Sequence, residues 1–275
     1  MRVAISSLDV RTIGDFAEQW HRFPNPHGAG YSGSTEYLAD LLHPLIRLDE
    51  LKDAYVAEIG AGTGRIVKML LESGARKALA LEPSDSIGVL RRNVEIYQDR
   101  VEIVHATGDQ LPARDFDLVL CIGVMQHVSQ PLPVLQAALA SLKPGGRFFM
   151  WLYAKEGTLL YRSLIIPVRA VTRRLPDPIL NAFCRTLNFV LERYIALCRR
   201  FQFLPLSRYI TEVSGRISRE ARIMGIYDQL NPAWVRYYSR AEIEGMMREA
   251  GFTDVKAFHW NGYSWSVAGT RFHAA

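Results

Sequence analysis

The chain has 275 residues, enough to bury one large α/β core or a core with an added subdomain. Its 49% hydrophobic and 22% charged residues are ordinary for a folded protein, and no uncharged apolar run reaches the 18 residues of a transmembrane helix. The first residues become charged too soon for a secretory signal. Three cysteines without metal-ligand spacing are typical of reduced thiols, so we expect a cytoplasmic protein that holds no metal.

The net charge of +5 is unevenly distributed along the chain. Residues 157–236 contain 13 arginines, no lysines and 5 acidic residues, which gives this segment a net charge of +8, whereas the remainder carries −3. The positive field therefore belongs to one segment of the chain.

Residues 1–50 are predicted to form a helical segment that leads into the main domain and acts as a lid. A helical pattern over Phe16–Phe23 is followed by a loop rich in proline and glycine, and Ser34 can cap a second helix.

From Ala54 onward the chain alternates predicted strands and helices, which is typical of a parallel sheet with crossover helices. Strands are predicted at Tyr55–Ile59, Lys77–Leu81, Val101–His105, Phe116–Ile122 and Arg147–Tyr153. Helices are predicted at Arg65–Glu72, Ser86–Ile96 and Leu132–Leu142. The sequence K-P-G-G at 143–146 predicts a turn before the fifth strand.

Residues 157–236 interrupt this alternation with long patterns of apolar residues and arginines, punctuated by prolines. They predict several helices inserted after the fifth strand. The alternation resumes with a helix at Ser239–Ala250, and strands at Asp254–Trp260 and Ser264–Arg271 are predicted to form a hairpin. The expected organisation is a lead-in at 1–50, an α/β domain at 51–156 and 237–275, and an insertion at 157–236.

The first strand runs into a glycine-rich loop with the sequence E-I-G-A-G-T-G-R. Glycines at every second position let the backbone turn tightly and approach a ligand, and the following helix directs free N–H groups toward it. The spacing is G-x-G-x-G, which differs from the G-x-G-x-x-G of dinucleotide-binding domains. The carboxylate of Glu58, two residues before the first glycine, suits a cationic ligand better than a pyrophosphate.

This loop resembles the first motif of class I S-adenosylmethionine-dependent methyltransferases. The later motifs follow in order: Glu82 and Pro83 after the second strand, H-A-T-G-D-Q-L-P after the third, and the fourth strand with K-P-G-G beyond it. The resemblance covers about residues 54–153 and returns near residue 250. It implies a Rossmann-like α/β fold with a doubly wound, mostly parallel seven-stranded sheet that ends in an antiparallel hairpin. It also implies S-adenosyl-L-methionine as cofactor, with S-adenosyl-L-homocysteine as product.

The resemblance further implies which residues bind the cofactor. Glu82 would hold the ribose hydroxyls, and Asp109 would lie near the adenine, with Thr107 as the alternative in an ungapped match. The predicted cofactor-binding residues are Glu58, Gly60, Gly62, Gly64, Glu82, Pro83, Asp109, Gln110, Cys121, Ile122 and Tyr31.

Histidines are the candidate general bases, because an oxygen acceptor gains from a base whose pKa lies near neutrality. His127 follows the fourth strand in M-Q-H-V, where many small-molecule methyltransferases also have a histidine. His259 and His21 are further candidates. A structural role for His127, framing the cofactor pocket, stays open because methyl transfer can rely on positioning and the exclusion of water.

The leading hypothesis is a methyltransferase that acts on a small-molecule acceptor, with oxygen as the expected acceptor atom and the insertion as a substrate cap. A nucleic-acid methyltransferase would use the arginines to bind phosphates, but the fourth strand lacks the Asn/Asp-Pro-Pro-aromatic signature of enzymes that methylate base amino groups. Peripheral membrane docking with a lipophilic acceptor is another alternative. A homodimer formed through the insertion would show the same sequence pattern.

Overall fold

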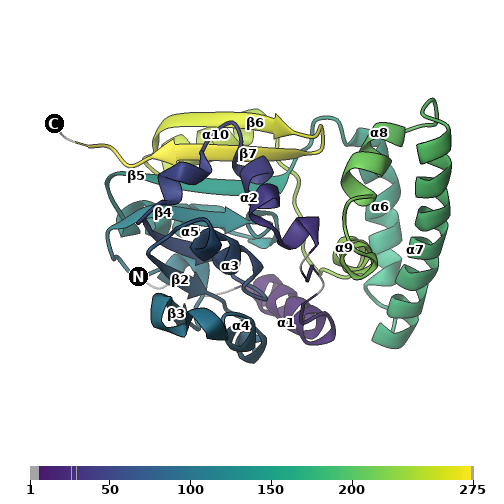
Figure 1. Ribbon diagram of the computed structural model, residues 1–275, viewed down its shortest axis with the longest axis horizontal. Coiled ribbons are helices and arrows are strands. Elements are labelled where there is room, and N and C mark those ends of the chain that lie inside the picture. The colour runs from purple at the N-terminus through teal and green to yellow at the C-terminus, as the bar shows by residue number, and fades with distance from the viewer. Residues whose placement is uncertain (1–5, 26, 29, 274–275) are drawn as a thin grey trace.

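A computed structural model of the protein describes residues 6–25, 27–28 and 30–273. Its centre is a seven-stranded sheet in the order β3-β2-β1-β4-β5-β7-β6 (Figure 1). The strands are β1 Tyr55–Ile59, β2 Lys77–Leu81, β3 Val101–Val104, β4 Phe116–Ile122, β5 Leu142–Tyr153, β6 Thr253–Trp260 and β7 Ser264–Thr270. β1 to β5 run parallel, and β7 lies antiparallel between β5 and β6. The predicted α/β fold with a terminal antiparallel pair is confirmed.

The central strands are apolar on both faces because helices cover both faces of the sheet. In β4, Val119 and Cys121 pack into one core cluster, and Leu118 and Leu120 pack into the other, as the two-residue period of a strand requires. Helices α5 Pro131–Ser141 and α10 Arg240–Glu249 contribute to the first cluster. Helices α2 Thr35–Leu42, α3 Arg65–Glu72 and α4 Ile87–Asn93 contribute to the second.

Serine side chains cap the starts of α2 and α10. The side chain of Ser34 accepts a hydrogen bond from the Tyr37 N–H at the start of α2, and Ser239 forms a capping box with Glu242 at the start of α10. Short helical turns fill the connections: η1 Tyr31–Gly33, η2 Leu48–Leu51, η3 Glu95–Arg100, η4 Gly108–Gln110 and η5 Met125–His127.

Two predicted boundaries in the sheet domain differ from the structure by three residues or more, and the others there by at most one. β5 begins at Leu142, which pairs with Phe116 before the K-P-G-G turn, so this turn lies inside the strand pairing as an irregularity. The helix predicted over Ser86–Ile96 ends at Asn93, and the chain continues as η3.

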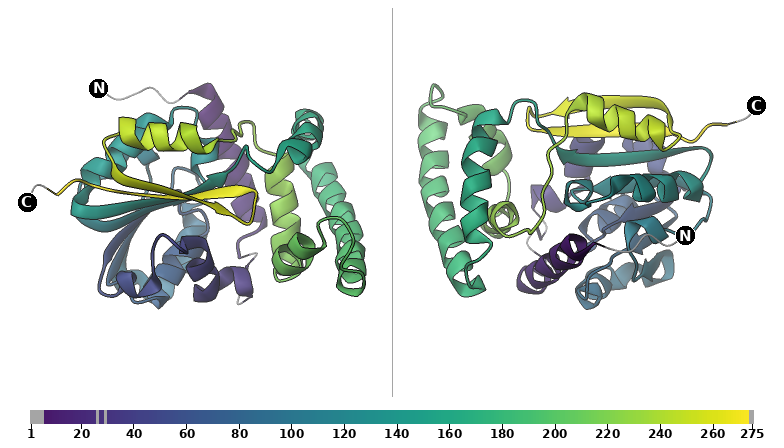
Figure 2. Two further views of the ribbon diagram at one scale, coloured as in Figure 1. Left: turned by 90° about the horizontal axis from the view of Figure 1, so that it is seen from above. Right: turned by 180° about the vertical axis from the view of Figure 1, so that it is seen from behind.

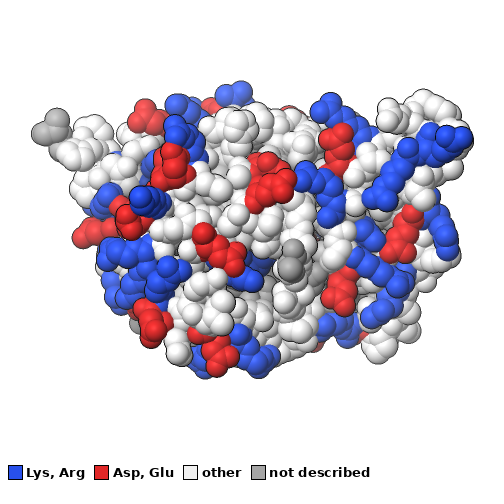
Figure 3. Space-filling view, viewed as in Figure 1, with Lys and Arg blue, Asp and Glu red and all other residues white. Residues whose placement is uncertain are grey.

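The insertion consists of α6 Leu159–Thr172, α7 Asp177–Arg200, α8 Ser207–Tyr209, the π-helical turn η6 Ile210–Ser214 and α9 Arg219–Leu230. These helices form a separate layer at one end of the sheet, with α9 on the inner side and α7 outermost (Figures 1 and 2). Basic side chains gather on the right-hand part of the surface, over α7 and α8 (Figure 3).

The N-terminal helix α1, Ser7–Arg22, makes polar contacts with both the sheet domain and the insertion. Its Asp9 accepts hydrogen bonds from the N–H and hydroxyl of Ser129, beyond β4. On the insertion side, Asp15 accepts a hydrogen bond of 2.8 Å from the Ala233 N–H, and Arg22 pairs with Asp177. The lead-in thus bridges the sheet domain and the inserted helices.

Candidate active site

The glycine loop between β1 and α3 requires glycine for steric reasons. Gly60, Gly62 and Gly64 all have positive φ, at 73°, 54° and 82°. A Cβ on Gly60 would lie 2.4 Å from the side chain of Val124, and one on Gly62 would lie 3.1 Å from the indole of Trp20. The loop is therefore packed against the segment after β4 on one side and against α1 on the other.

Glu82 stands at the end of β2, where the parallel strands present their carboxyl ends. Its side chain is buried and accepts hydrogen bonds from the Gly62 N–H at 2.7 Å and the Ser84 N–H at 3.0 Å. Burial raises the pKa of this carboxyl, against the opposing effect of those hydrogen bonds. Glu82 and Pro83 both line a large cavity.

That cavity has a volume of about 900 Å³ and is bounded by α1, the carboxyl ends of β1 to β5, and the inserted helices. The segment after β3 contributes Thr107, Gly108 and Asp109, and the Thr107 hydroxyl donates a hydrogen bond of 2.6 Å to the Asp109 carboxylate. Both residues weighed for the adenine position thus lie at the wall, whereas Gln110 does not line the cavity.

At the end of β4, one of the two predicted residues lines the cavity and the other does not. Ile122 lines the cavity, but Cys121 is fully buried within the core of the sheet, because neighbouring residues of a strand face opposite sides. Burial raises the pKa of the Cys121 thiol to about 12, so it stays protonated.

Glu58 and two of the loop glycines do not line the cavity. Glu58 is only 2% exposed and does not line the cavity, and burial raises the pKa of its carboxyl well above the ordinary value. Glu58, which was expected to contact a cationic ligand, therefore lies behind the wall of this cavity. Gly62 lies under Trp20, and Gly64 caps α3; of the three loop glycines, Gly60 lines the cavity.

His127 lies in η5 and is one of the residues that line the cavity. Its Nδ1 is 2.9 Å from the carbonyl oxygen of Trp234, which can only accept, so Nδ1 carries the proton. Its Nε2 is buried and has no hydrogen-bond partner among the residues that the structure describes. Burial lowers the pKa of this histidine, and the nearby carboxylate of Asp228 opposes that effect.

The other predicted candidates lie away from the cavity. His259 stacks on Trp265 with ring centroids 4.5 Å apart, and His21 is exposed on α1. Tyr31 hydrogen-bonds to Asp40, and the guanidinium of Arg216 lies 3.6 Å from the centre of its ring. None of these three predicted residues lines the cavity.

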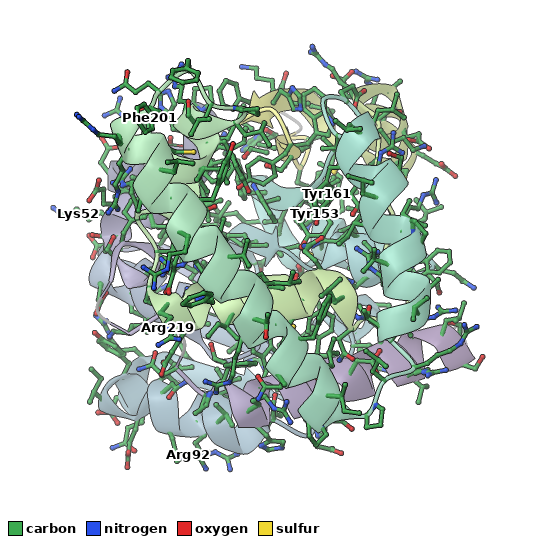
Figure 4. All side chains as sticks on the ribbon, turned by 90° about the vertical axis from the view of Figure 1, so that its right-hand side faces the viewer. Lys52, Arg92, Tyr153, Tyr161, Phe201 and Arg219 are labelled. Carbon is green, nitrogen blue, oxygen red and sulfur yellow. The ribbon has the colours of Figure 1, made fainter. Side chains whose placement is uncertain are left out.

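A polar network that the sequence did not reveal joins the end of β5 to the insertion. The Tyr153 hydroxyl donates a hydrogen bond of 2.8 Å to Asp228 and accepts one of 2.6 Å from Gln229. Tyr161 donates a hydrogen bond of 2.9 Å to the Gln229 side-chain oxygen. All four residues line the cavity, and Figure 4 shows Tyr153 and Tyr161 between the inserted helices. No motif surrounds Asp228 or Gln229, so sequence patterns offered no signal for them.

The N-terminal segment supplies further cavity residues. Phe16 and Trp20 of α1 line the cavity, and Phe16 contacts the His127 ring edge-on at a centroid distance of 4.8 Å. Arg65, at the start of α3, also lines it and donates a hydrogen bond to the Ser32 carbonyl oxygen. Within residues 6–25, 27–28 and 30–273, no three His, Cys, Asp or Glu side chains form a cluster suited to a metal ion.

Comparisons with known proteins agree with this geometry. A family model for a methyltransferase domain matches residues 32–257. The chain is 31% identical over 115 residues to a ubiquinone biosynthesis O-methyltransferase from Dinoroseobacter shibae, covering 41% of this chain and 45% of that protein. It is 26% identical over 143 residues to a tRNA U34 carboxymethyltransferase from Pseudoalteromonas atlantica, covering 50% of this chain and 44% of the relative. The chain thus spans less than half the length of these two relatives.

Among solved structures, the fold is similar to that of 1,6-didemethyltoxoflavin-N1-methyltransferase from Burkholderia thailandensis, which was determined with 1,6-didemethyltoxoflavin and S-adenosylhomocysteine. The TM-score is 0.55 at 14% sequence identity, over 99% of this chain and 93% of that one. The family match extends over most of the described structure, from the lead-in to the terminal hairpin. The chain therefore belongs to the methyltransferase domain family, and its fold is that of class I, S-adenosyl-L-methionine-dependent methyltransferases.

Proposed function

We propose that this enzyme methylates a small organic acceptor, with oxygen as the accepting atom and with the inserted helices as the cap of the acceptor site. One observation carries the proposal: a single cavity is lined both by the residues of the cofactor motifs and by a polar network that belongs to none of them. Glu82 and Asp109 represent the first set, and Tyr153 and Asp228 the second.

The cofactor motifs have the chemistry that the cofactor requires. Each oxygen of Glu82 accepts one backbone N–H, and an ionised carboxylate has lone pairs left for two ribose hydroxyls. Asp109 lines the same wall, and we assign it to the adenine end. When bound, S-adenosyl-L-methionine supplies an electrophilic methyl group. The protein must orient the acceptor and remove its proton.

His127 is proposed as the general base. Because its Nδ1 proton is committed to the Trp234 carbonyl, Nε2 of the neutral ring carries a lone pair. The lowered pKa keeps the ring neutral at pH 7 and ready to accept a proton from an acceptor hydroxyl. The carboxylate of Asp228 would then stabilise the imidazolium that forms, since its charge favours the protonated ring.

The rest of the wall supports an acceptor with a flat or apolar body. The aromatic side chains Phe16, Trp151, Tyr161, Tyr237 and Tyr263 all line the cavity. Asp228 and Gln229 offer hydrogen-bond partners among these rings, which would orient a hydroxyl group. The ubiquinone biosynthesis relative carries O-methyltransferase in its name, which supports oxygen as the acceptor atom.

The residues of the insertion support its role as a cap. Tyr161, Asp228 and Gln229 belong to the segment 157–236 and contribute to the same wall as Phe16 and Trp20 of the lead-in. The hydrogen bond from the Ala233 N–H to Asp15 holds these two segments together.

Calorimetry with S-adenosylhomocysteine tests the cofactor half of the proposal. Wild-type protein should bind it, and Glu82→Gln should lose about 1–3 kcal/mol of binding free energy, because an amide replaces the charged acceptor of two hydroxyls. Glu95→Gln, an exposed carboxylate on η3, is the matched control and should bind like wild type. Absence of binding by the wild-type protein would refute the proposal.

The acceptor half is tested by measuring S-adenosylhomocysteine release with a panel of phenols, other alcohols, amines and a tRNA mixture. Turnover with hydroxylated compounds supports the proposal. Turnover with amines or tRNA alone would contradict it.

A further inference from the structure

The outer side of the insertion exposes large apolar side chains. Among the most exposed are Leu160, Leu164, Val171, Val190, Phe203 and Leu206, with exposed fractions from 59% to 84%. They come from α6, α7 and the loop at 201–206, and we call them the outer apolar face. Exposed apolar surface beyond what a monomer usually presents marks a site of interaction with a partner or a membrane.

Helix α7 carries two apolar stripes, and the domain uses only one of them. The buried stripe includes Leu180, Cys184, Ile195 and Cys198. The second stripe recurs at intervals of three and four residues on a neighbouring side of the helix: Phe183, Leu187, Val190, Tyr194, Leu197 and Phe201. Most of the second stripe is exposed, so intramolecular packing does not account for it.

The charges around the outer apolar face are almost all positive. Residues 159–209 contain nine arginines, no lysines and two acidic residues. Both acidic residues are already paired: Asp177 with Arg22, and Glu192 with Arg222. By contrast, Arg174, Arg185 and Arg208 are exposed, and none of these three forms an ion pair with any described residue.

This combination favours an anionic lipid surface over other partners. A second copy of the chain would bring the same positive face toward the first, and like charges repel. Nucleic acid would match the arginines but would leave leucine and phenylalanine side chains against phosphates. A lipid interface accommodates both, since apolar side chains enter the acyl boundary while arginines contact anionic headgroups.

The cavity opens on this same face. Tyr161 of α6, Leu187 of α7 and Leu206 of the following loop line the cavity, and each is at least 36% exposed. Viewed from the outer side, Tyr161 and Tyr153 lie between α6 and α7 (Figure 4). In the part of the chain that the structure describes, no helix is long and apolar enough to cross a bilayer, so contact would be with the surface.

We propose that the outer apolar face docks on the surface of an anionic lipid membrane, with α6 and α7 lying along it and the cavity opening toward the lipid. Resting on the proposed function, this docking implies that the methyl acceptor is lipophilic and enters from the membrane between these two helices.

Vesicle flotation tests the docking, with the full chain and no acceptor. The protein should float with vesicles of phosphatidylcholine and phosphatidylglycerol at low salt, but only weakly with phosphatidylcholine alone or at high salt. The triple variant Arg174→Gln, Arg185→Gln, Arg208→Gln should partition on the order of 100-fold more weakly, at about fivefold for each arginine. The matched control changes Arg76, Arg91 and Arg92, three exposed arginines of the sheet domain, to Gln and should float like wild type.

The apolar contribution has its own matched pair. Phe203 is 84% exposed on the outer apolar face, and Ile96 is 78% exposed near α4. Phe203→Glu should reduce flotation strongly, whereas Ile96→Glu should leave it unchanged.

The docking proposal would be overturned if the protein did not float with anionic vesicles, or if the control variants lost as much flotation as the test variants. It would also be overturned if the protein bound no vesicles and light scattering showed a dimer that Phe203→Glu dissociates. A gel shift with RNA that the triple arginine variant abolishes, without vesicle binding, would also overturn it. Binding of S-adenosylhomocysteine in solution is independent of the surface. Its loss would contradict the proposed function, and failed flotation would contradict only the docking.

Discussion

The phenol of Tyr153 donates a hydrogen bond of 2.8 Å to the carboxylate of Asp228, and this bond joins the last parallel strand to the inserted helix α9 across the cavity. The two residues are 75 positions apart in the chain. Burial and the Asp228 charge raise the pKa of Tyr153 well above the ordinary value, so the phenol remains a donor at all physiological pH values.

The Tyr153–Asp228 pair should stabilise the packing of α9 against the end of β5. Tyr153→Phe removes a hydroxyl that donates to Asp228 and accepts from Gln229, leaving both groups without that partner. We expect a loss of about 1–3 kcal/mol in the free energy of unfolding, measured by urea denaturation. In a double-mutant cycle with Asp228→Asn, the two losses should be less than additive. The affinity for S-adenosylhomocysteine should hardly change; a large decrease would mean that the pair shapes the cofactor site.

The rate of methyl transfer should depend on pH through His127. Its pKa is lowered from 6.5 by burial, so the basic form persists through neutral pH and is lost only as the pH falls through this lowered value. The wild-type kcat should therefore be flat near pH 7 and fall in the acid range. His127→Gln should lower kcat by about 10²–10⁴-fold and abolish that acid limb, while cofactor affinity is retained. An unchanged rate and profile would show that positioning alone accounts for catalysis.

The same shift affects stability. Because His127 is buried in its neutral form, the unfolded chain binds a proton more readily than the folded chain once the pH falls below 6.5. This residue should therefore decrease the free energy of unfolding as the pH falls below that value. Comparing the pH dependence of unfolding for wild type and His127→Gln would isolate the contribution.

Methyl transfer should proceed in the presence of a chelator. The described residues form no cluster of metal ligands, and the proposed proton acceptor is a side chain. Turnover measured with and without EDTA should agree. Activity lost in EDTA and restored by Mg²⁺ would contradict the assigned chemistry.

The sequence by itself determined the sheet and one wall of the cavity. β1, β2, β4 and α3 have the predicted bounds, because their apolar runs are ended by glycine, proline or acidic residues. Gly60, Glu82 and Asp109 line one cavity because the carboxyl ends of parallel strands meet at the same edge of a sheet. The bounds of these elements follow from local residue patterns, and the shared cavity wall follows from the strand order that such patterns imply.

Which residues of the lead-in and the insertion form the other wall of the cavity was decided only by the tertiary structure. Trp20 covers Gly62, and Asp228 reaches Tyr153, through contacts between segments whose separation along the chain no periodic pattern encodes. Amphipathic spacing shows that α7 has apolar stripes, but the stripe that becomes buried depends on the helices against which it packs. Alternation likewise left open whether Cys121 or Ile122 would face the cavity; in the structure Cys121 is buried in the core on one face of β4, and Ile122, on the other face, lines the cavity.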